Sequence, residues 1–259
     1  MNLIAIDIGN SSINIGFFAE GSLMIQKIRT IPLLSSPEYA EMMNEFAAKG
    51  NIDKMPEGII ISSVVPGHTE AIKKACSALS KKEPVILTNK MKTGIDFHIE
   101  EPEKLGTDRI AAAAGACDLF GAPVAVIDFG TATTLSFIGS GNKYKGGAIM
   151  PGLELMRKSL FSDTAQLPAV AVSKPLSPVG KNTAECIRSG IVYGTAGAVE
   201  RIISETEKAE GENFKVIVTG CNADLIAPFL RKVDYLEPAL VLKGLRFIYS
   251  LSDGRMHNA

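Results

Sequence analysis

The sequence predicts an α/β protein of two similar domains, each a mixed five-stranded sheet flanked by helices, with the active site in the cleft between them. The first reason is a repeated motif, because the stretches Ile6 to Ser12 (IDIGNSS) and Ile127 to Thr133 (IDFGTAT) each close an apolar run. The second is the alternation of strand and helix patterns after each copy. The third is the length of 259 residues, which suits two ordinary domains. We therefore expect an N-terminal domain over residues 1–115 and a C-terminal domain over residues 116–259.

The first half begins with three apolar segments separated by short turns, the pattern of an antiparallel meander. Ser36 and Pro37 are typical of the cap and the first residue of a helix. The alternation after this helix implies parallel strands joined by helical crossovers. The expected elements are strands at residues 3–8, 13–18 and 23–29, a helix at 36–49, a strand at 59–61, a helix at 69–79 and a strand at 85–87.

The second half repeats this plan with longer helices. Before the second half begins, an alanine-rich segment at 110–120 predicts a close-packed helix. Within the second half, Pro175 and Pro178 mark a surface loop over residues 169–180. The expected elements are strands at 124–127, 134–138, 143–149 and 216–218, and helices at 152–161, 183–209, 223–230 and 240–251.

The composition is that of a globular protein without a bulk electrostatic preference. Hydrophobic residues make up 46% of the chain, charged residues 21%, and the net charge is −1, so we expect no nucleic-acid partner and no membrane partner. The N-terminus lacks a signal-peptide pattern, and no apolar run reaches the roughly 20 residues of a membrane span. We therefore expect a cytoplasmic protein.

The cysteines and histidines are scattered, which argues against a zinc site, a disulfide framework and a Ser/His/Asp or Cys/His hydrolase. Three cysteines lie in helical or apolar contexts and are expected to be small buried residues. These three are Cys76, Cys117 and Cys186; the fourth is Cys221, and the histidines are His68, His98 and His257.

Each aspartate turn has the parts of a phosphate site. A strand delivers the aspartate, a glycine allows a tight turn, and exposed N–H groups with short side chains follow. Such a turn can hold phosphate oxygens, and its carboxylate can hold a cation or its water. A single Asp-x-Gly is equally an ordinary hairpin turn. Two copies that open two similar halves favour one phosphate-handling cleft.

Further motifs, in order along the chain, carry a family resemblance. They are Gly106-Thr107-Asp108-Arg109, Gly146 to Gly152 (GGAIMPG), Thr164 to Pro168 (TAQLP), Gly180 to Thr183 (GKNT) and Thr219-Gly220. With the aspartate turns, the set resembles the type III pantothenate kinases over nearly the whole chain. That family belongs to the superfamily of acetate and sugar kinases, heat-shock chaperone ATPases and actin. The resemblance therefore implies two actin-like, ribonuclease H-like domains.

The resemblance also implies an activity and its requirements. ATP would phosphorylate the primary hydroxyl of pantothenate to give 4′-phosphopantothenate, the first step of coenzyme A synthesis. Mg²⁺, a monovalent cation such as K⁺ or NH₄⁺, and a homodimer are implied as well. Two positions depart from the family pattern. Cys221 stands where the family usually has a second glycine, and Ile99 where it often has a tyrosine of the pantothenate pocket.

By this resemblance, the two aspartate turns bind the nucleotide and the cations. Asp7 would hold Mg²⁺ or its waters, Asp128 the monovalent cation and Thr131 a nucleotide phosphate. Gly220 would admit the adenine or ribose. The other nucleotide contacts would be Gly9, Asn10, Ser11, Ser12, Ile13 and Asn14. The alternative is that the aspartates and Thr131 only satisfy tight turns.

By the same resemblance, the residues that bind pantothenate are those of the G-T-D-R run and Thr183. Asp108 would be the catalytic base that accepts the proton of the pantothenate hydroxyl. Arg109 would hold the substrate carboxylate through two hydrogen bonds. Gly106, Thr107 and Thr183 would be further contacts. The alternatives are a helix cap for Thr107 or Asp108, a solvated surface position for Arg109, and a place in a first helical turn for Thr183.

Two other functions stay open at this point. One is a non-catalytic regulatory protein of the same family, and the other is a superfamily kinase that acts on a sugar or acetate.

A homodimer has separate support in the segment Gly146 to Pro168, which is rich in large apolar residues. At helical spacing Leu153, Met156 and Leu160 form one inward stripe. Leu155 and Phe161 are then left to face a partner.

Overall fold

The computed structural model describes residues 2–19, 21–49, 56–80 and 82–252, and the chain divides into two compact units. Unit 1 is drawn from Met1–Ile95, Glu100–Asp118 and Leu240–Ala259, and unit 2 from Asp96–Ile99 and Leu119–Ala239. The expected division at residue 115 falls inside a helix. The contacts place the C-terminal helix with unit 1 and the short segment Asp96–Ile99 with unit 2.

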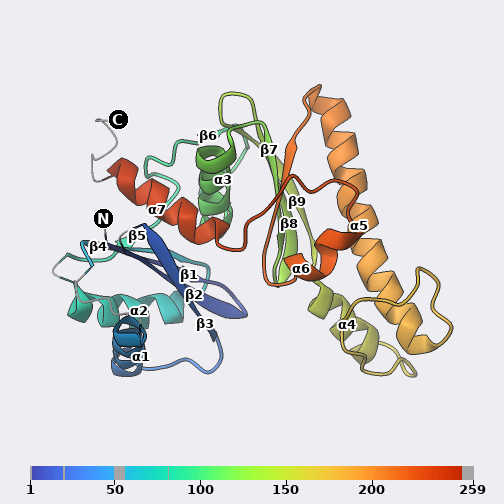
Figure 1. The fold of residues 1–259 in the computed structure, drawn as a ribbon, viewed down its shortest axis with the longest axis horizontal. Coiled ribbons are helices and arrows are strands. Elements are labelled where there is room, and N and C mark those ends of the chain that lie inside the picture. The colour runs from blue at the N-terminus through green and yellow to red at the C-terminus, as the bar shows by residue number, and fades with distance from the viewer. Residues whose placement is uncertain (1, 20, 50–55, 81, 253–259) are drawn as a thin grey trace. The chain divides into compact units, whose positions relative to one another are not determined.

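Unit 1 is built on a mixed five-stranded sheet in the order β3-β2-β1-β4-β5 (Figure 1). The first three strands form the antiparallel meander, and the last two are parallel to β1. The strands are β1 (Leu3–Ile8), β2 (Ser12–Ala19), β3 (Ser22–Arg29), β4 (Gly58–Ser63) and β5 (Val85–Ile86). The helices are α1 (Ser36–Lys49), α2 (Pro66–Leu79), the 3-10 helix η1 (Pro102–Lys104), α3 (Thr107–Phe120) and α7 (Leu240–Ser252).

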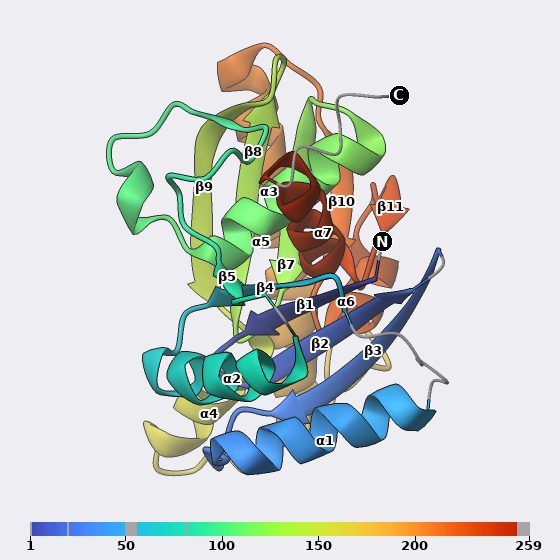
Figure 2. The same cartoon turned by 90° about the vertical axis from the view of Figure 1, so that its left-hand side faces the viewer.

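The two faces of this sheet have different roles. The isoleucines at alternate positions of β1 (Ile4, Ile6 and Ile8) pack with Ile59 and Ile61 of β4 and with α1 and α2. The opposite face is covered by α7, which packs on β1 and β4 (Figure 2). Asp7 lies on this second face, at the end where β1 stops.

Helices α3 and α7 meet through glycines. A Cβ at Gly115 would lie 2.8 Å from the Leu240 carbonyl oxygen, and a Cβ at Gly244 would collide with the Ala111 carbonyl oxygen. The alanine-rich pattern of α3 therefore serves a close helix crossing. This crossing fixes the helix that begins with the G-T-D-R run.

Unit 2 repeats the meander and adds strands at both sides, in the order β11-β10-β7-β8-β9-β6. Its strands are β6 (Asp96–Phe97), β7 (Val124–Phe129), β8 (Ala132–Gly139), β9 (Lys143–Pro151), β10 (Lys215–Thr219) and β11 (Tyr235–Leu236). Its helices are α4 (Leu153–Ser162), α5 (Thr183–Glu210), α6 (Ala223–Ile226) and the 3-10 helix η2 (Ala227–Phe229). Helices α4, α5 and α6 bury one face of the sheet.

The strands and helices expected from the sequence are present, and two details are corrected. The second sheet has six strands instead of five, because β6 pairs with the edge of β9. The helix expected at 223–230 is two short pieces, since Pro228 cannot donate an N–H to a continuing α-helix. Residues 169–180 form a loop, as expected.

Among the described residues, none of the helices has both the length and the apolar character needed to cross a membrane.

Candidate functional site

A buried threonine fixes the first aspartate turn through hydrogen bonds to its main chain. Thr30 is 3% exposed, and its Oγ1 donates to the Gly9 carbonyl oxygen at 2.7 Å. Its main-chain N–H donates to the Ser11 carbonyl oxygen at 3.3 Å, and Gly9 N donates to the Ser12 carbonyl oxygen at 3.0 Å. Asn10 and Ser11 are exposed at the tip. The turn is therefore a fixed loop whose outer side faces solvent.

Three polar side chains gather beside this turn because of strand register. Asp7 pairs with Asn14 of β2 on one side and with Ser62 of β4 on the other. Paired residues project from the same face of a sheet, so the three are neighbours. Asp7 Oδ1 is buried, and Ser62 has no exposed surface. The side chain of Ile13 points to the opposite face, into the core.

The start of α3 is tied to the end of β4. Thr107 Oγ1 lies 3.0 Å from Ser62 Oγ and accepts from the Ser63 main-chain N–H at 3.2 Å. Asp108 Oδ1 accepts from the Arg109 main-chain N–H at 2.8 Å, which is a local bond of the first helical turn. These bonds bring the G-T-D-R run to the strand end next to Asp7. A prediction from sequence missed Ser62 and Ser63, although two hydroxyl residues closing a buried strand were a usable signal.

Gly106 is required by the carboxylate that follows it. A Cβ at this position would collide with Asp108 Oδ1. The absence of a side chain therefore lets the Asp108 carboxylate lie against the main chain at the helix start.

The second aspartate turn is enclosed by three glycines of unit 2. A Cβ at Gly220 would collide with Asp128 Oδ1 and would lie 2.6 Å from the Phe129 nitrogen. Gly220 also has φ of +96°, where other residues are strained. Gly130 and Gly152 close the turn, whose Thr131 carbonyl oxygen accepts from Gly152 N at 3.1 Å. Asp128 Oδ1 is thus buried in a close-fitting main-chain cradle.

Cys221 fits beside this cradle without a left-handed backbone. Among the described residues, the only non-glycine with positive φ is Asn142, so position 221 does not need glycine. The Cys221 thiol lies 3.7 Å from the Phe129 carbonyl oxygen, which also accepts from Asn222 N at 3.0 Å. The departure from the family pattern therefore leaves the Asp128 turn intact.

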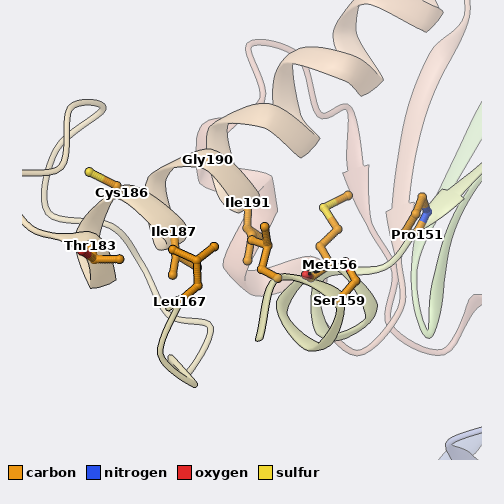
Figure 3. Close-up of a pocket in the computed structure, with 10 residues that line it drawn as sticks. Pro151, Met156, Ser159, Leu167, Thr183, Cys186, Ile187, Gly190 and Ile191 are labelled. Carbon is orange, nitrogen blue, oxygen red and sulfur yellow. Dashed lines mark hydrogen bonds between the residues drawn. The ribbon is translucent and has the colours of Figure 1, made fainter. Parts of the chain in front are cut away.

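Thr183 lies at the first turn of α5 and lines a pocket of about 530 Å³ in unit 2 (Figure 3). The helix is capped by Asn182, whose side chain accepts from Glu185 N at 3.0 Å. Pro151 lines the pocket as well. The next residue, Gly152, donates a main-chain hydrogen bond to the Thr131 carbonyl oxygen of the second aspartate turn. The pocket walls are mainly apolar and come from α4, α5 and the loop between them.

The cysteines divide into two pairs. Burial raises the pKa of the Cys76 and Cys117 thiols to about 12, so both stay protonated at neutral pH. Cys76 is buried as expected, whereas Cys117 is only partly buried. Cys186 was expected to be buried and is exposed, because it lies in the exposed first turns of α5. Cys221 is exposed too. His257 lies outside the described residues.

Both aspartate turns offer oxygen donors suited to hard cations. Asp7 has the amide of Asn14 and the hydroxyl of Ser62 as neighbours on its face of the sheet. Carboxylate, amide and hydroxyl oxygens suit Mg²⁺ and alkali cations better than zinc. The Asp128 cradle offers a carboxylate beside main-chain carbonyl groups. The donor chemistry at both turns therefore fits the cations that the resemblance implies.

Solved structures with a similar fold include an activator of 2-hydroxyisocaproyl-CoA dehydratase from Clostridium difficile with bound ADPNP. Its TM-score is 0.58 at 12% identity, covering 100% of this chain and 98% of that one. Component A of (R)-2-hydroxyglutaryl-CoA dehydratase from Acidaminococcus fermentans has a TM-score of 0.57 at 12% identity, covering 98% and 99%. These likenesses concern the fold, and they confirm the predicted two-domain actin-like class.

A Campylobacter jejuni protein described as a conserved Baf family transcriptional activator has a TM-score of 0.62 at 20% identity, covering 97% of this chain and 99% of that one. The family model described as type III pantothenate kinase matches residues 3–205, which is most of the chain. The chain therefore belongs to the type III pantothenate kinase family.

Proposed function

We propose that this protein transfers the γ-phosphoryl group of ATP to the primary hydroxyl of pantothenate, giving 4′-phosphopantothenate and ADP. One observation carries the proposal beyond family membership. The Asp7 strand end and the helix start with Asp108 and Arg109 are joined within one unit through Ser62 and Thr107. A phosphate-handling turn and a candidate base therefore share one rigid support.

The chain's own groups supply positioning and charge. Asp108 accepts the proton of the hydroxyl as its oxygen bonds to phosphorus and the bond to the ADP oxygen breaks. Arg109 holds the carboxylate of pantothenate with its planar guanidinium. Both residues lie in the first turn of α3, where the helix dipole favours anions.

The first turn supplies contacts to the nucleotide. The turn from Gly9 to Ser12 lines the phosphates through the main-chain N–H groups and short side chains of its exposed tip, Asn10 and Ser11, and Asn14 extends this surface. Asp7 would hold Mg²⁺ directly or through water, and the ion would neutralise charge on the phosphates when bound. Thr131 and Gly220 of unit 2 are assigned to a phosphate and to the adenosine side.

The experiment is an ADP-release assay with purified protein over a small panel of substrates. Pantothenate should be the substrate, and acetate and common sugars should give only the background ATPase rate. Release with a sugar or acetate would instead favour another kinase of the superfamily.

A regulatory protein without activity is the second candidate, and the similarity to the Campylobacter jejuni protein described as a transcriptional activator favours it. The retention of Asp7, Asp108, Arg109 and Asp128 together supports the enzyme. A regulatory protein would bind ATP without releasing ADP in the presence of pantothenate. As a biosynthetic kinase with no nucleic-acid or membrane partner, the protein would work in the cytoplasm.

Asp128 is proposed as the ligand of a monovalent cation, K⁺ or NH₄⁺. Replacing K⁺ by Na⁺ at constant ionic strength should lower turnover, because a smaller ion fits the same cradle poorly. Asp128→Ala should lower turnover by about 10²-fold, on the scale of losing one preorganised electrostatic contact. The variant should then be indifferent to the exchange of salts.

The measurement is steady-state turnover in both salts for the wild type, Asp128→Ala and the exposed control Asp163→Ala. The control should keep the wild-type response to K⁺. Equal wild-type activity in K⁺ and Na⁺ would contradict the cation site.

The active form is proposed to be a homodimer whose interface includes the outer side of α4. Leu153, Met156 and Leu160 pack toward the core of unit 2, as the helical spacing predicted. Leu155 is 43% exposed and Phe161 is 51% exposed. Exposed large apolar residues on one helix support an interface.

Phe161→Glu should raise the dimer dissociation constant at least about tenfold, because twofold symmetry introduces the charge twice at one contact. It should also weaken pantothenate binding more than ATP binding. Sedimentation and substrate titration measure both effects. Ile25→Glu is the matched control, since Ile25 is 44% exposed in unit 1. A fully active wild-type monomer at micromolar concentration would refute the dimer.

A further inference from the structure

A cluster of hydroxyl groups surrounds the end of β4 in unit 1. Ser62 and Ser63 close the strand, Thr69 belongs to the start of α2, and Thr107 begins α3. The function proposed above uses the contact between Ser62 and Thr107 as a structural link, and it gives neither serine a role in the reaction. Because two helices start at this strand end, the two serines are placed to fix both of them.

Ser63 is engaged with α2. Its Oγ accepts from Thr69 Oγ1 at 2.7 Å and from the Val65 main-chain N–H at 3.0 Å. Val65 is the residue before the first turn of α2. The Ser63 side chain therefore serves the α2 start, and only its main-chain atoms reach Thr107.

Ser62 is engaged with α3. Its Oγ lies 3.0 Å from Thr107 Oγ1, and the residue has no exposed surface. Thr107 Oγ1 accepts from Ser63 N at 3.2 Å and lies 3.3 Å from the Ser63 carbonyl oxygen. If Thr107 donates to that carbonyl, Ser62 donates to Thr107, and the threonine hydroxyl uses all of its hydrogen-bonding capacity. The α3 start is thus fixed by a partly buried and saturated set of bonds.

Ser62 also stands directly beside the first aspartate turn. It is the register partner of Asp7 on the face of the sheet that α7 covers. The Ser62 side chain therefore lies between β1, which carries Asp7, and the start of α3, where Asp108 follows Thr107.

We propose that Ser62 is a positioning residue, which acts through Thr107 to set the Asp108 carboxylate relative to the phosphate-binding turn. The role in catalysis rests on the proposed kinase function. The positioning itself concerns only the α3 start and is testable without catalysis.

Ser62→Ala should lower turnover about tenfold, because small misplacements of a reacting group cost one to two powers of ten in rate. The KM for ATP should stay within about twofold, since the residues of the nucleotide turn are unchanged. Ser63→Ala is the matched control: it removes the neighbouring hydroxyl, which serves α2, and should leave turnover near wild type.

Thr107 supplies the second pair of variants. Thr107→Ser keeps the hydroxyl and should leave hydrogen exchange of the α3 first-turn amides at the wild-type rate, whereas Thr107→Val removes the hydroxyl at similar volume and should speed that exchange as Ser62→Ala does. The double variant Ser62→Ala/Thr107→Val should be no slower than the worse single variant, because both remove one interaction. If Ser62→Ala does not fold, the Thr107 pair carries the same test.

The independent readout is native-state hydrogen exchange of the α3 first-turn amides, including the Ile110 N–H that donates to the Gly106 carbonyl. Exchange there should be about tenfold faster in Ser62→Ala and unchanged in Ser63→Ala. Unchanged α3 exchange in Ser62→Ala, or equal losses of turnover in both serine variants, would overturn the proposal. A wild type without pantothenate kinase activity would refute the proposed function alone, and the exchange experiment would still decide the positioning.

Discussion

Asp108→Asn is expected to lower the turnover number for pantothenate phosphorylation by about 10² to 10⁴-fold, the usual cost of removing a general base. The amide has nearly the shape of the carboxylate, but it cannot take the proton from the substrate hydroxyl. ATP binding should persist, because the residues of the Asp7 turn are untouched. Stopped-assay turnover and titration with a non-hydrolysable ATP analogue measure the two properties.

The matched control for this prediction is Glu103→Gln. Glu103 is an exposed carboxylate of η1, a few residues before the G-T-D-R run. Glu103→Gln removes the same charge from a residue that has no role in proton transfer. The turnover of this variant should therefore equal that of the wild type. Turnover of Asp108→Asn within about threefold of wild type would show that Asp108 is only a helix-start residue.

Gly244→Ala is expected to lower the free energy of unfolding by about 3 kcal/mol, at the upper end of overpacking effects, because the clash is with main chain. The new methyl group would collide with the Ala111 carbonyl oxygen, and a Cβ at Gly115 would meet α7 in the same way. Helices α3 and α7 would have to separate. The melting temperature should fall by about 6 to 12 °C, as for domains of this size.

Gly197→Ala tests whether this loss comes from the crossing or from the glycine itself. Gly197 lies in α5, and a Cβ there meets nothing within 4 Å. The substitution should stabilise the protein by about 0.5 to 1 kcal/mol through helix propensity. Chemical denaturation of both variants gives the comparison. A Gly244→Ala protein as stable as the wild type would contradict the close crossing.

Strong periodic signals made most of the fold predictable from sequence. The apolar runs of β1 and β7 and the Ser-Pro start of α1 mark elements that local residues alone specify. The cap of α1 is Ser35 and not the expected Ser36, because α1 begins at Ser36 and the Glu38 carboxylate accepts from the Ser35 N–H and hydroxyl. The two-residue strands β6 and β11 were missed, because neither belongs to an apolar run such as the one from Val85 to Leu87 that marks β5. The placement of α7 in unit 1 depends on a distant partner, α3, and a linear pattern carries no such information.

The candidate site was predictable where a motif brings its residues together locally. The turn from Asp7 to Ser12 and the run from Gly106 to Arg109 are each one continuous segment. Thr30, directly after β3, and Ser62 of β4 support these segments from elsewhere in the chain, so only the pairing of strands reveals them. Ile13 was named as a nucleotide contact because it continues the motif, but the alternation of side chains on β2 turns its side chain into the core.

The most direct test of the central claim is the identity of the product formed from ATP and pantothenate by the purified protein in Mg²⁺ and K⁺. Mass spectrometry and ³¹P NMR would identify the phosphorylated compound, and an ADP assay would give its stoichiometry. The account predicts 4′-phosphopantothenate, formed in equal amount to ADP and absent with Asp108→Asn. ATP binding without any phosphorylated pantothenate, under the same conditions, would contradict it.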